Sequence, residues 1–262
     1  MSKTILITGS TDGIGLLTAQ LLASEGHTIL LHGRSAAKLA TAAAQVDGAT
    51  ESYVADLSRM DEVDAMAVAI LQRHEKLDVL INNAGVLKAP ETQTAEGLDI
   101  RFVVNTLAPY HLARRLLPII PKDGRIVNLS SAAQARIDGD ALAGQMMLDD
   151  MAAYAQSKLA ITIWTQELAK ELGEGPVVVA VNPGSLLASK MVKEGFGIAG
   201  SDLSIGAEIL CKAALDPSFA TASGRYFDND AGQFGPPNAA ASDRDHVGMV
   251  MQGIEKTLAR LI

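Results

Sequence analysis

Short apolar runs alternate with longer amphipathic segments along most of the chain. Runs rich in aliphatic and β-branched residues predict strands at residues 3–7, 28–32, 52–55, 77–81, 125–129, 177–181 and 225–227. Segments of helical length and spacing lie at residues 14–25, 35–46, 60–74, 94–117, 151–172 and 204–215. Strands that are apolar on both faces belong in a parallel sheet with helices on both sides. The alternation predicts an α/β fold with a doubly wound parallel sheet of about seven strands.

The remaining segments are consistent with a single domain over residues 1–262. Residues 132–150 and 185–203 are irregular, and each follows a strand, so both belong at the carboxyl edge of the sheet, where ligands bind. Residues 234–238 have the composition of a loop, and residues 247–261 predict a closing helix. No linker-like tract divides the chain.

Composition and charge narrow the class of protein. Hydrophobic residues make up 48% of the 262 residues, enough to bury a core and too many for a disordered chain. The formal net charge is -8, and the basic residues are scattered rather than gathered on one segment. A nucleic-acid partner needs a basic surface, so none is expected.

Cysteine, histidine and hydropathy give further expectations. Cys211 is the single cysteine, so no internal disulfide can form and a reducing, cytoplasmic location is expected. No secretory signal and no apolar stretch of membrane-spanning length is visible. The five histidines are dispersed, which gives a metal site no support.

A glycine-rich loop follows the first predicted strand and opens the first predicted helix. Gly9, Gly13 and Gly15 allow a tight turn and a close approach of the backbone to a pyrophosphate at the helix N-terminus. A glycine-rich turn without a ligand is the alternative. The order of strand, loop and helix favours dinucleotide binding, the function of a Rossmann fold.

Tyr154 and Lys158 are four residues apart in a predicted helix, so they share one face. A phenol with a pKa of about 10 exchanges protons poorly at neutral pH. A lysine ammonium one turn away, with the charge of an oxidised nicotinamide, is expected to lower that pKa. Tyr154 then acts as the acid in reduction and as the base in oxidation. A buried tyrosine beside a solvated lysine is the alternative, which the preceding Ser130-Ser131 strand end disfavours.

These motifs together resemble the short-chain dehydrogenase/reductase family over residues 4–230. The resemblance implies a catalytic set of Asn105, Ser131, Tyr154 and Lys158. Ser131 would donate a hydrogen bond to the substrate oxygen, and Asn105 would sit in a locally distorted helix that holds a water beside Lys158. That water would complete a proton relay from Tyr154 to solvent. Ser130 is interpreted as a capping or packing residue.

The same resemblance implies a set of cofactor-binding residues along the carboxyl edge of the sheet. Besides Asn105, Tyr154 and Lys158, they are Gly9, Ser10, Thr11, Asp12, Gly13, Ile14, Gly15, Arg34, Asp56, Leu57, Asn83, Ala84, Gly85, Pro183, Gly184 and Ser189. Asp56 could instead cap the helix that begins near Ser58. Ser189 lies one residue further from the Pro183-Gly184 turn than the family pattern has it.

The choice between NADP and NAD depends on the end of the second strand. A carboxylate there would bind the ribose hydroxyls of NAD, whereas this chain has Arg34, which can bind a 2′-phosphate. Asp12 argues the other way, because many NADP-using relatives have a basic residue at that place. A solvated Arg34 is the third reading. NADP is favoured over NAD.

The segment between Ser131 and Tyr154 is longer than in many members of the family. It is similar to the retinol-dehydrogenase-like and WW-domain-oxidoreductase-like branch, which implies an apolar alcohol, aldehyde or ketone as substrate. Apolar residues of both irregular segments suggest an adaptable pocket, or core under a loop: Met146, Met147, Leu148, Met151, Leu186, Leu187, Met191, Val192 and Phe196. Asp149 and Asp150 are expected to cap the Tyr154 helix.

Two further hypotheses remain at this stage. A dinucleotide-binding redox sensor without turnover is the alternative to an NADP(H)-dependent oxidoreductase, although it would not need the Ser131, Tyr154 and Lys158 relay. A homodimer or homotetramer is expected from the apolar face of the Tyr154 helix. Ile161, Trp164 and Leu168 on that face could pack against a second copy, or they could be core.

Overall fold

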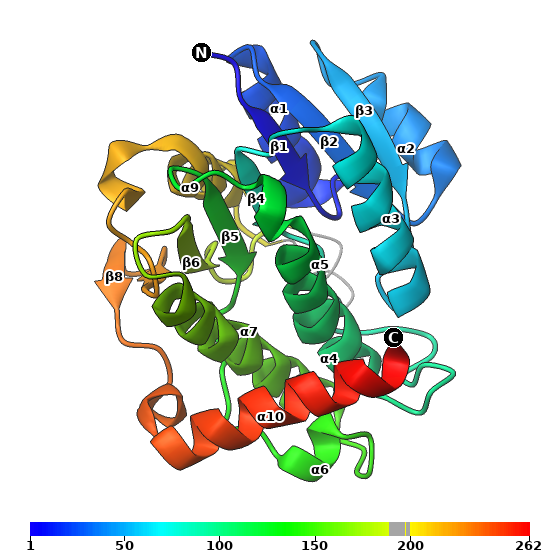
Figure 1. Cartoon of the computed structure of the whole chain (residues 1–262), viewed down its shortest axis with the longest axis vertical. Helices are drawn as coiled ribbons and strands as arrows, with labels where there is room; N and C mark the ends of the chain where they lie inside the picture. Colours follow the sequence, from blue (N-terminus) through cyan, green and yellow to red (C-terminus); the bar gives the residue numbers. More distant parts are fainter. Residues whose placement is uncertain (189–196, 198–199) are drawn as a thin grey trace.

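A parallel sheet forms the centre of the computed structural model, which describes residues 1–188, 197 and 200–262 (Figure 1). Within these residues eight strands lie in the order β3-β2-β1-β4-β5-β6-β7-β8. Their bounds are β1 Thr4–Ile7, β2 Thr28–Gly33, β3 Thr50–Val54, β4 Val79–Asn82, β5 Arg125–Leu129, β6 Val177–Asn182, β7 Tyr226–Asp228 and β8 Gln233–Gly235. The first seven pair in parallel, and β8 pairs antiparallel with β7.

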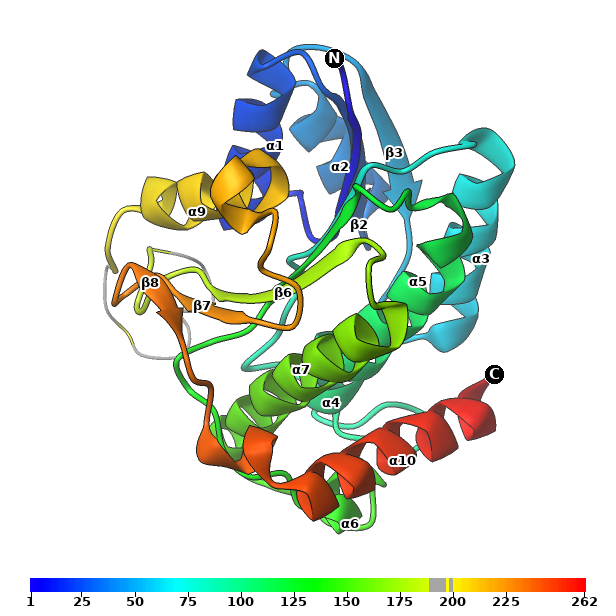
Figure 2. The same ribbon diagram turned by 60° about the vertical axis from the view of Figure 1, so that its left-hand side comes forward.

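Helices cover both faces of this sheet (Figure 2). One layer contains α1 (Gly13–Ser24), α2 (Ala36–Ala43) and α9 (Leu203–Leu215). The other contains α3 (Met60–Arg73), α4 (Ile100–Phe102), a π-helix (Val103–Leu107), α5 (Ala108–Leu116), α7 (Asp150–Leu172) and α10 (Arg244–Leu261), with α6 (Gly139–Leu142) packed on α10. Short 3-10 turns lie at Leu117–Ile119, Pro217–Phe219 and Ala239–Ser242.

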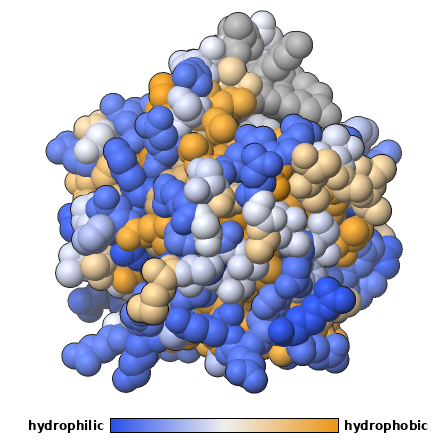
Figure 3. Space-filling model, turned by 90° about the horizontal axis from the view of Figure 1, so that it is seen from above, coloured by the Kyte–Doolittle hydropathy of each residue, from blue (hydrophilic) through white to orange (hydrophobic). Residues whose placement is uncertain are grey.

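The strands are apolar throughout because both of their faces are covered. In β1, Ile5 and Ile7 enter the core beside α1 and α9, whereas Leu6 enters the core on the opposite face. All three side chains are fully buried. Charged groups are therefore displaced to the outer surface, and the face of the molecule in Figure 3 is mostly hydrophilic.

The α/β class, the parallel order and the helices on both faces are confirmed, but the strand count is wrong by one within the described residues. The missed strand, β8, falls in the segment predicted to be a loop. It has three residues, too few for a readable period, and it is held by a cluster of Phe219, Phe227 and Phe234, with Arg225 lying 4.0 Å from the Phe234 ring centroid.

The structure also differs from the predictions in two segments, 94–117 and 132–150. The segment 94–117 does not form one helix, because Thr94 and Leu98 are joined in a turn by a backbone hydrogen bond. Asp99 then caps α4, and the π-helix and α5 follow in succession. The irregular segment 132–150 contains the short helix α6, which begins where Asp138 accepts hydrogen bonds from the backbone of Asp140 and Ala141. Spacing alone predicts neither feature, since both depend on capping bonds.

The predicted docking face of the Tyr154 helix is core. Trp164 is fully buried and Ile161 and Leu168 are nearly so, in one cluster with Val250 and Ile254 of α10. The C-terminal helix of the same chain thus takes the place that a second copy was expected to take. These three side chains are not available for a homodimer or homotetramer contact.

The order of the strands places the loops that carry polar motifs at one edge of the sheet. The strand order reverses at β1, which pairs with β2 on one side and β4 on the other. A crevice opens at such a reversal, beyond the carboxyl ends of the strands. The glycine loop after β1 and the segments after β4, β5 and β6 meet there.

Candidate active site

The glycine loop is packed so closely that only glycine fits at two positions. A Cβ on Gly15 would lie 2.4 Å from the Gly9 carbonyl oxygen and 2.5 Å from the amide nitrogen of Asn83. Gly9 has φ of +65°, and a Cβ there would lie 2.9 Å from Ala84 Cα. The Asn83 amide donates to the carbonyls of Thr8 and Gly9 at 2.8 and 3.0 Å. The loop after β4 therefore fixes the loop after β1.

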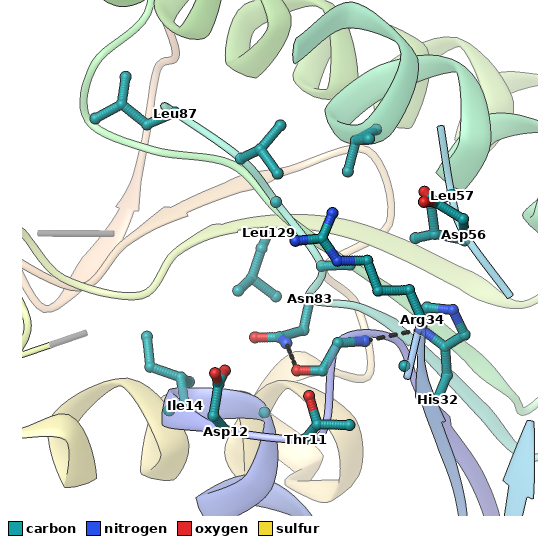
Figure 4. A pocket seen from close by; sticks show the side chains of 18 of the residues that line it. Thr11, Asp12, Ile14, His32, Arg34, Asp56, Leu57, Asn83, Leu87 and Leu129 are labelled. Atoms are coloured by element: carbon teal, nitrogen blue, oxygen red, sulfur yellow. Dashed lines mark hydrogen bonds between the residues drawn. The ribbon is translucent and has the colours of Figure 1, made fainter. Parts of the chain in front are cut away.

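A cavity of about 400 Å³ opens over this loop (Figure 4). The predicted residues that line it are Gly9, Thr11, Asp12, Gly13, Ile14, Gly15, Arg34, Asp56, Leu57, Asn83, Ala84, Gly85, Tyr154, Lys158 and Pro183. Ser10, Asn105, Ser131 and Gly184 lie behind or beside its wall, and Ser189 lies outside the described residues. One cavity thus brings together the glycine loop and the Tyr154–Lys158 pair.

Tyr154 and Lys158 lie on one face of α7, as their spacing predicts. The Lys158 ammonium donates to the Leu129 carbonyl at 2.7 Å and lies 5.7 Å from the centroid of the Tyr154 ring. Only 4% of Lys158 is exposed, and burial lowers its pKa to about 8. The solvated lysine of the alternative reading is therefore wrong.

Lys158 alone does not lower the pKa of the phenol, which was predicted for Lys158 and an oxidised nicotinamide acting together. In this structure burial raises the pKa of Tyr154, and a hydrogen bond with the Ser131 hydroxyl opposes that rise. Lys158 contributes little because its ammonium is directed to Leu129 rather than to the phenol oxygen. Tyr154 is thus protonated at neutral pH, the form that an acid in carbonyl reduction requires.

Asn105 lies in the π-helix, so the local helix distortion implied by the family resemblance is present. Its side chain is fully buried and fully bonded. The amide donates to the Val86 carbonyl at 2.9 Å and to Ser157 Oγ at 3.0 Å, and its oxygen accepts from Val86 N at 2.8 Å. The side chain therefore joins the segment after β4 to α7.

The two serines at the end of β5 have different surroundings. Ser130 is buried, and its hydroxyl bonds the Lys158 carbonyl at 3.0 Å and Thr162 Oγ1 at 2.7 Å, so its predicted packing role is met. Ser131 is partly exposed beside Tyr154, and its backbone carbonyl accepts from Gln134 Nε2 and from the Tyr226 hydroxyl. Of the two, Ser130 lines the cavity, whereas Ser131 lies beside it next to Tyr154, and the predicted contact of Ser131 with a substrate stays a prediction.

A buried ion cluster fixes the start of α7. Arg101 is fully buried and donates to both oxygens of Asp99 and to Asp150. Asp149 accepts a hydrogen bond from Ala152 N at 2.8 Å, so the predicted cap is present. Arg101 and its role have no motif in the sequence, because an arginine followed by an apolar run resembles any surface residue.

Both predicted acidic groups, Asp12 and Asp56, line the cavity, one from the glycine loop and the other from the segment after β3. Asp56 Oδ1 accepts from the backbone and hydroxyl of Ser58 at 2.9 and 2.7 Å, and the following helix α3 takes Arg59 as its N-cap. Asp56 therefore forms a local turn rather than the helix cap. Asp12 is the N-cap residue of α1 but its carboxylate makes no capping bond.

Two cations also line the cavity, in the segment that follows β2. Arg34 and Lys38 are exposed, and neither forms an ion pair with residues 1–188, 197 or 200–262. Ser35 between them caps α2 by accepting from Lys38 N. Sequence reasoning found Arg34 but missed Lys38, which reaches the cavity because it lies one turn into α2.

The turn after β6 is held from the neighbouring hairpin. Asp230 accepts from the backbone and hydroxyl of Ser185 and from the Asn182 amide, at 2.5 to 2.9 Å. Asn229 donates to the Pro183 carbonyl at 2.9 Å. The turn that carries Pro183 is thus positioned by the β7–β8 hairpin, of which only β7 was predicted.

The fold and this cavity define a dinucleotide-binding protein of the doubly wound α/β class. A family model described as short chain dehydrogenase matches residues 3–196. Retinol dehydrogenase 13 of Homo sapiens is 35% identical over 253 residues, covering 86% of this chain and 76% of the human protein. Retinol dehydrogenase 12 of Mus musculus is 34% identical over 244 residues, covering 86% and 77%.

Solved structures agree with this assignment. An uncharacterised protein from Mycobacterium Paratuberculosis has a TM-score of 0.81 at 27% identity, covering 97% of this chain and 92% of that chain. Landomycin C-6 ketoreductase, solved with bound NADP and rabelomycin, has a TM-score of 0.68 at 28% identity, covering 87% and 94%. The chain belongs to the short-chain dehydrogenase/reductase family and to its retinol-dehydrogenase-like branch, an enzyme family that binds NAD(P).

Membrane-spanning helices and metal-ligand groups were searched for in the described part of the chain. None of its helices is long and apolar enough to cross a membrane. Its side chains include no group of three or more histidines, cysteines or carboxylates placed to hold a metal ion.

We expect Gly15→Ala to weaken NADPH binding at least tenfold, because its Cβ would displace the Gly9 carbonyl or the Asn83 amide. Titration calorimetry measures the dissociation constant. Gly248→Ala in α10 is the matched control, since a Cβ there meets nothing within 4 Å. An unchanged affinity of Gly15→Ala would contradict this model of the loop.

We expect the stability of the protein to rise with pH from about 8 upward relative to that of Lys158→Met. The lowered pKa of Lys158, about 8, means that the unfolded chain binds more protons than the folded one above that pH. The difference in free energy of unfolding between the two proteins should change by roughly 2–3 kcal/mol between pH 7 and 10. Urea denaturation at several pH values measures it, and parallel curves would refute the charged, buried lysine.

Proposed function

We propose that the protein is an NADP(H)-preferring oxidoreductase that interconverts an alcohol and a carbonyl group on a mainly apolar substrate. The observation that carries this proposal is the placement of Tyr154 and Lys158 in the wall of the cavity that the glycine loop closes. A sensor without turnover would not need a buried lysine beside a buried phenol, an arrangement that costs stability.

The chemistry divides between the cofactor and the side chains. A bound nicotinamide cofactor would supply or accept the hydride. In reduction, Tyr154 gives its phenolic proton to the carbonyl oxygen as negative charge develops there, and the Ser131 hydroxyl donates a second hydrogen bond to that oxygen. Lys158 lies one turn along α7 from Tyr154 and is held by the Leu129 carbonyl, and its ammonium together with the charge of an oxidised nicotinamide would stabilise the phenolate left behind.

The residues at the end of β2 support NADP over NAD. Arg34 and Lys38 present two exposed cations to the cavity on either side of Ser35, and neither is paired within the described residues. A guanidinium and an ammonium suit a phosphate dianion. Landomycin C-6 ketoreductase was solved with NADP. Asp12 lies on the same cavity and opposes this preference, so the net effect depends on the two cations.

Exposed apolar side chains support the substrate class. Met146, Met147, Met151 and Leu186 are 38 to 45% exposed, and they come from the two segments predicted to border the substrate. Leu148 and Leu187 pack into the protein instead, and Met191, Val192 and Phe196 lie outside the described residues. The names of the relatives, retinol dehydrogenases and a landomycin C-6 ketoreductase, fit an alcohol or ketone as substrate.

We expect Tyr154→Phe to reduce turnover of a reactive ketone at least a thousandfold while NADPH binding stays within threefold. The variant keeps the ring against Lys158 and removes only the transferable proton. Tyr53→Phe, on β3 and outside the cavity, is the control. If the parent binds NADPH and neither protein turns over any of a broad carbonyl panel, the sensor alternative is favoured.

We expect the double variant Arg34→Ala, Lys38→Ala to raise KM for NADPH about 30-fold and KM for NADH less than threefold. Only NADPH carries the 2′-phosphate that the two cations would contact, and two charge-assisted contacts at an exposed site contribute roughly 2 kcal/mol together. Lys122→Ala, an exposed lysine outside the cavity, is the control. Equal changes for both cofactors would remove the basis for NADP preference.

A further inference from the structure

His32, in β2, lies under the glycine loop and was not singled out by any motif. It is 3% exposed and lines the floor of the cavity. Its ring Nδ1 lies 3.0 Å from the backbone nitrogen of Gly9, which donates to it, and its Nε2 lies 3.0 Å from the Ala55 carbonyl oxygen. The ring thus bridges the loop after β1 and the end of β3 (Figure 4).

These two partners define the tautomer. Nδ1 accepts from an N–H group and so carries no proton, whereas the Ala55 carbonyl can only accept and so requires a proton on Nε2. Both bonds exist together only in the neutral ring protonated on Nε2. Burial lowers the pKa of His32 to about 4, with the Asp56 carboxylate opposing that change, so this form persists across the neutral range.

The backbone of the same residue holds the next position of the loop. Ser10 N and Oγ both donate to the His32 carbonyl, at 3.0 and 3.3 Å, and His32 N donates to Ser10 Oγ at 2.9 Å. Any residue at position 32 could make the backbone part of these contacts. Only the ring bond to Gly9 depends on the side chain being histidine.

We propose that His32 is a positioning residue that presets the glycine loop for the dinucleotide by occupying the Gly9 N–H and bracing it against Ala55. This inference rests on the proposed function, because it assumes that the loop holds the cofactor. Ala55 precedes Asp56 and Leu57 in the cavity wall, so the ring also fixes the distance between the loop and that wall. Without an acceptor, Gly9 N–H would be unpaired in a partly buried site, and the loop would shift to satisfy it.

Substitution of His32 by asparagine or by glutamine distinguishes this positioning role from simple packing. Asparagine can place its oxygen where Nδ1 lies and can accept from Gly9, whereas glutamine reaches Ala55 with its amide nitrogen and leaves Gly9 unpaired. We expect His32→Gln and His32→Leu to weaken NADPH binding at least tenfold and His32→Asn to weaken it less than threefold. The kcat at saturating cofactor should change far less than the dissociation constant, because the ring touches no reacting atom.

Calorimetric titration with NADPH and thermal unfolding of all three variants make the test. A purely structural role predicts that the dissociation constants follow the loss of melting temperature, with Asn no better than Gln, and that result would overturn the proposal. Parental affinity in His32→Leu would also overturn it. Gly15→Ala distinguishes failure of the cofactor site from failure of the role of His32. If Gly15→Ala and the His32 variants all bind NADPH normally, the proposed cofactor site is wrong. If Gly15→Ala binds weakly and the His32 variants bind normally, only the role of His32 is wrong.

Discussion

A buried polar seam between β5 and α7 fixes the site on which the rest of the molecule depends. Asn82 donates to Asn128 at 2.8 Å, and Asn128 donates to Thr165 at 2.8 Å. Ser130 bonds Thr162, and Lys158 bonds the Leu129 carbonyl. Each of these side chains is nearly inaccessible to solvent. Sliding α7 along the sheet would leave several buried polar groups unpaired, at a cost of roughly 1–3 kcal/mol each, so this seam fixes where Tyr154 points.

The same burial determines the protonation of the catalytic pair. Removing Lys158 and Tyr154 from water penalises the charged form of each, so the pKa of the lysine falls and that of the phenol rises. Both shifts favour a neutral pair and thus oppose the phenolate. In the mechanism that we propose, the phenolate becomes accessible when positive charge enters the cavity beside it, so the proton chemistry would depend on occupancy of the dinucleotide site. Burying Lys158 and Tyr154 costs stability, which is consistent with a functional site rather than with a structural contact.

The sequence predicted the fold class and most of the cavity because these depend on local signals. Gly9 and Gly15 are recognisable since no other residue fits so close an approach, and the i,i+4 spacing of Tyr154 and Lys158 does not depend on the details of packing. His32 was missed because its ring acts through Gly9 and Ala55 on other segments, and Lys38 because it reaches the cavity only through the placement of α2. The strand β8 depends on contacts within an aromatic cluster. The burial of Trp164 in one cluster with α10 depends on how the C-terminal helix packs against α7.

The segment between Ser131 and Tyr154 is supported by the C-terminal part of the chain rather than by the cofactor cavity. Gln134 bonds Asn238 through both its backbone and its side chain, Arg136 pairs with Asp243, and Ile137 N donates to His246. The glycine loop, by contrast, is held by β2, β3 and the loop after β4. The two halves of the active site therefore have separate supports. Changes in α10 and the segment before it can alter the substrate side without disturbing the dinucleotide side, and Tyr154 on α7 lies where the two supports meet.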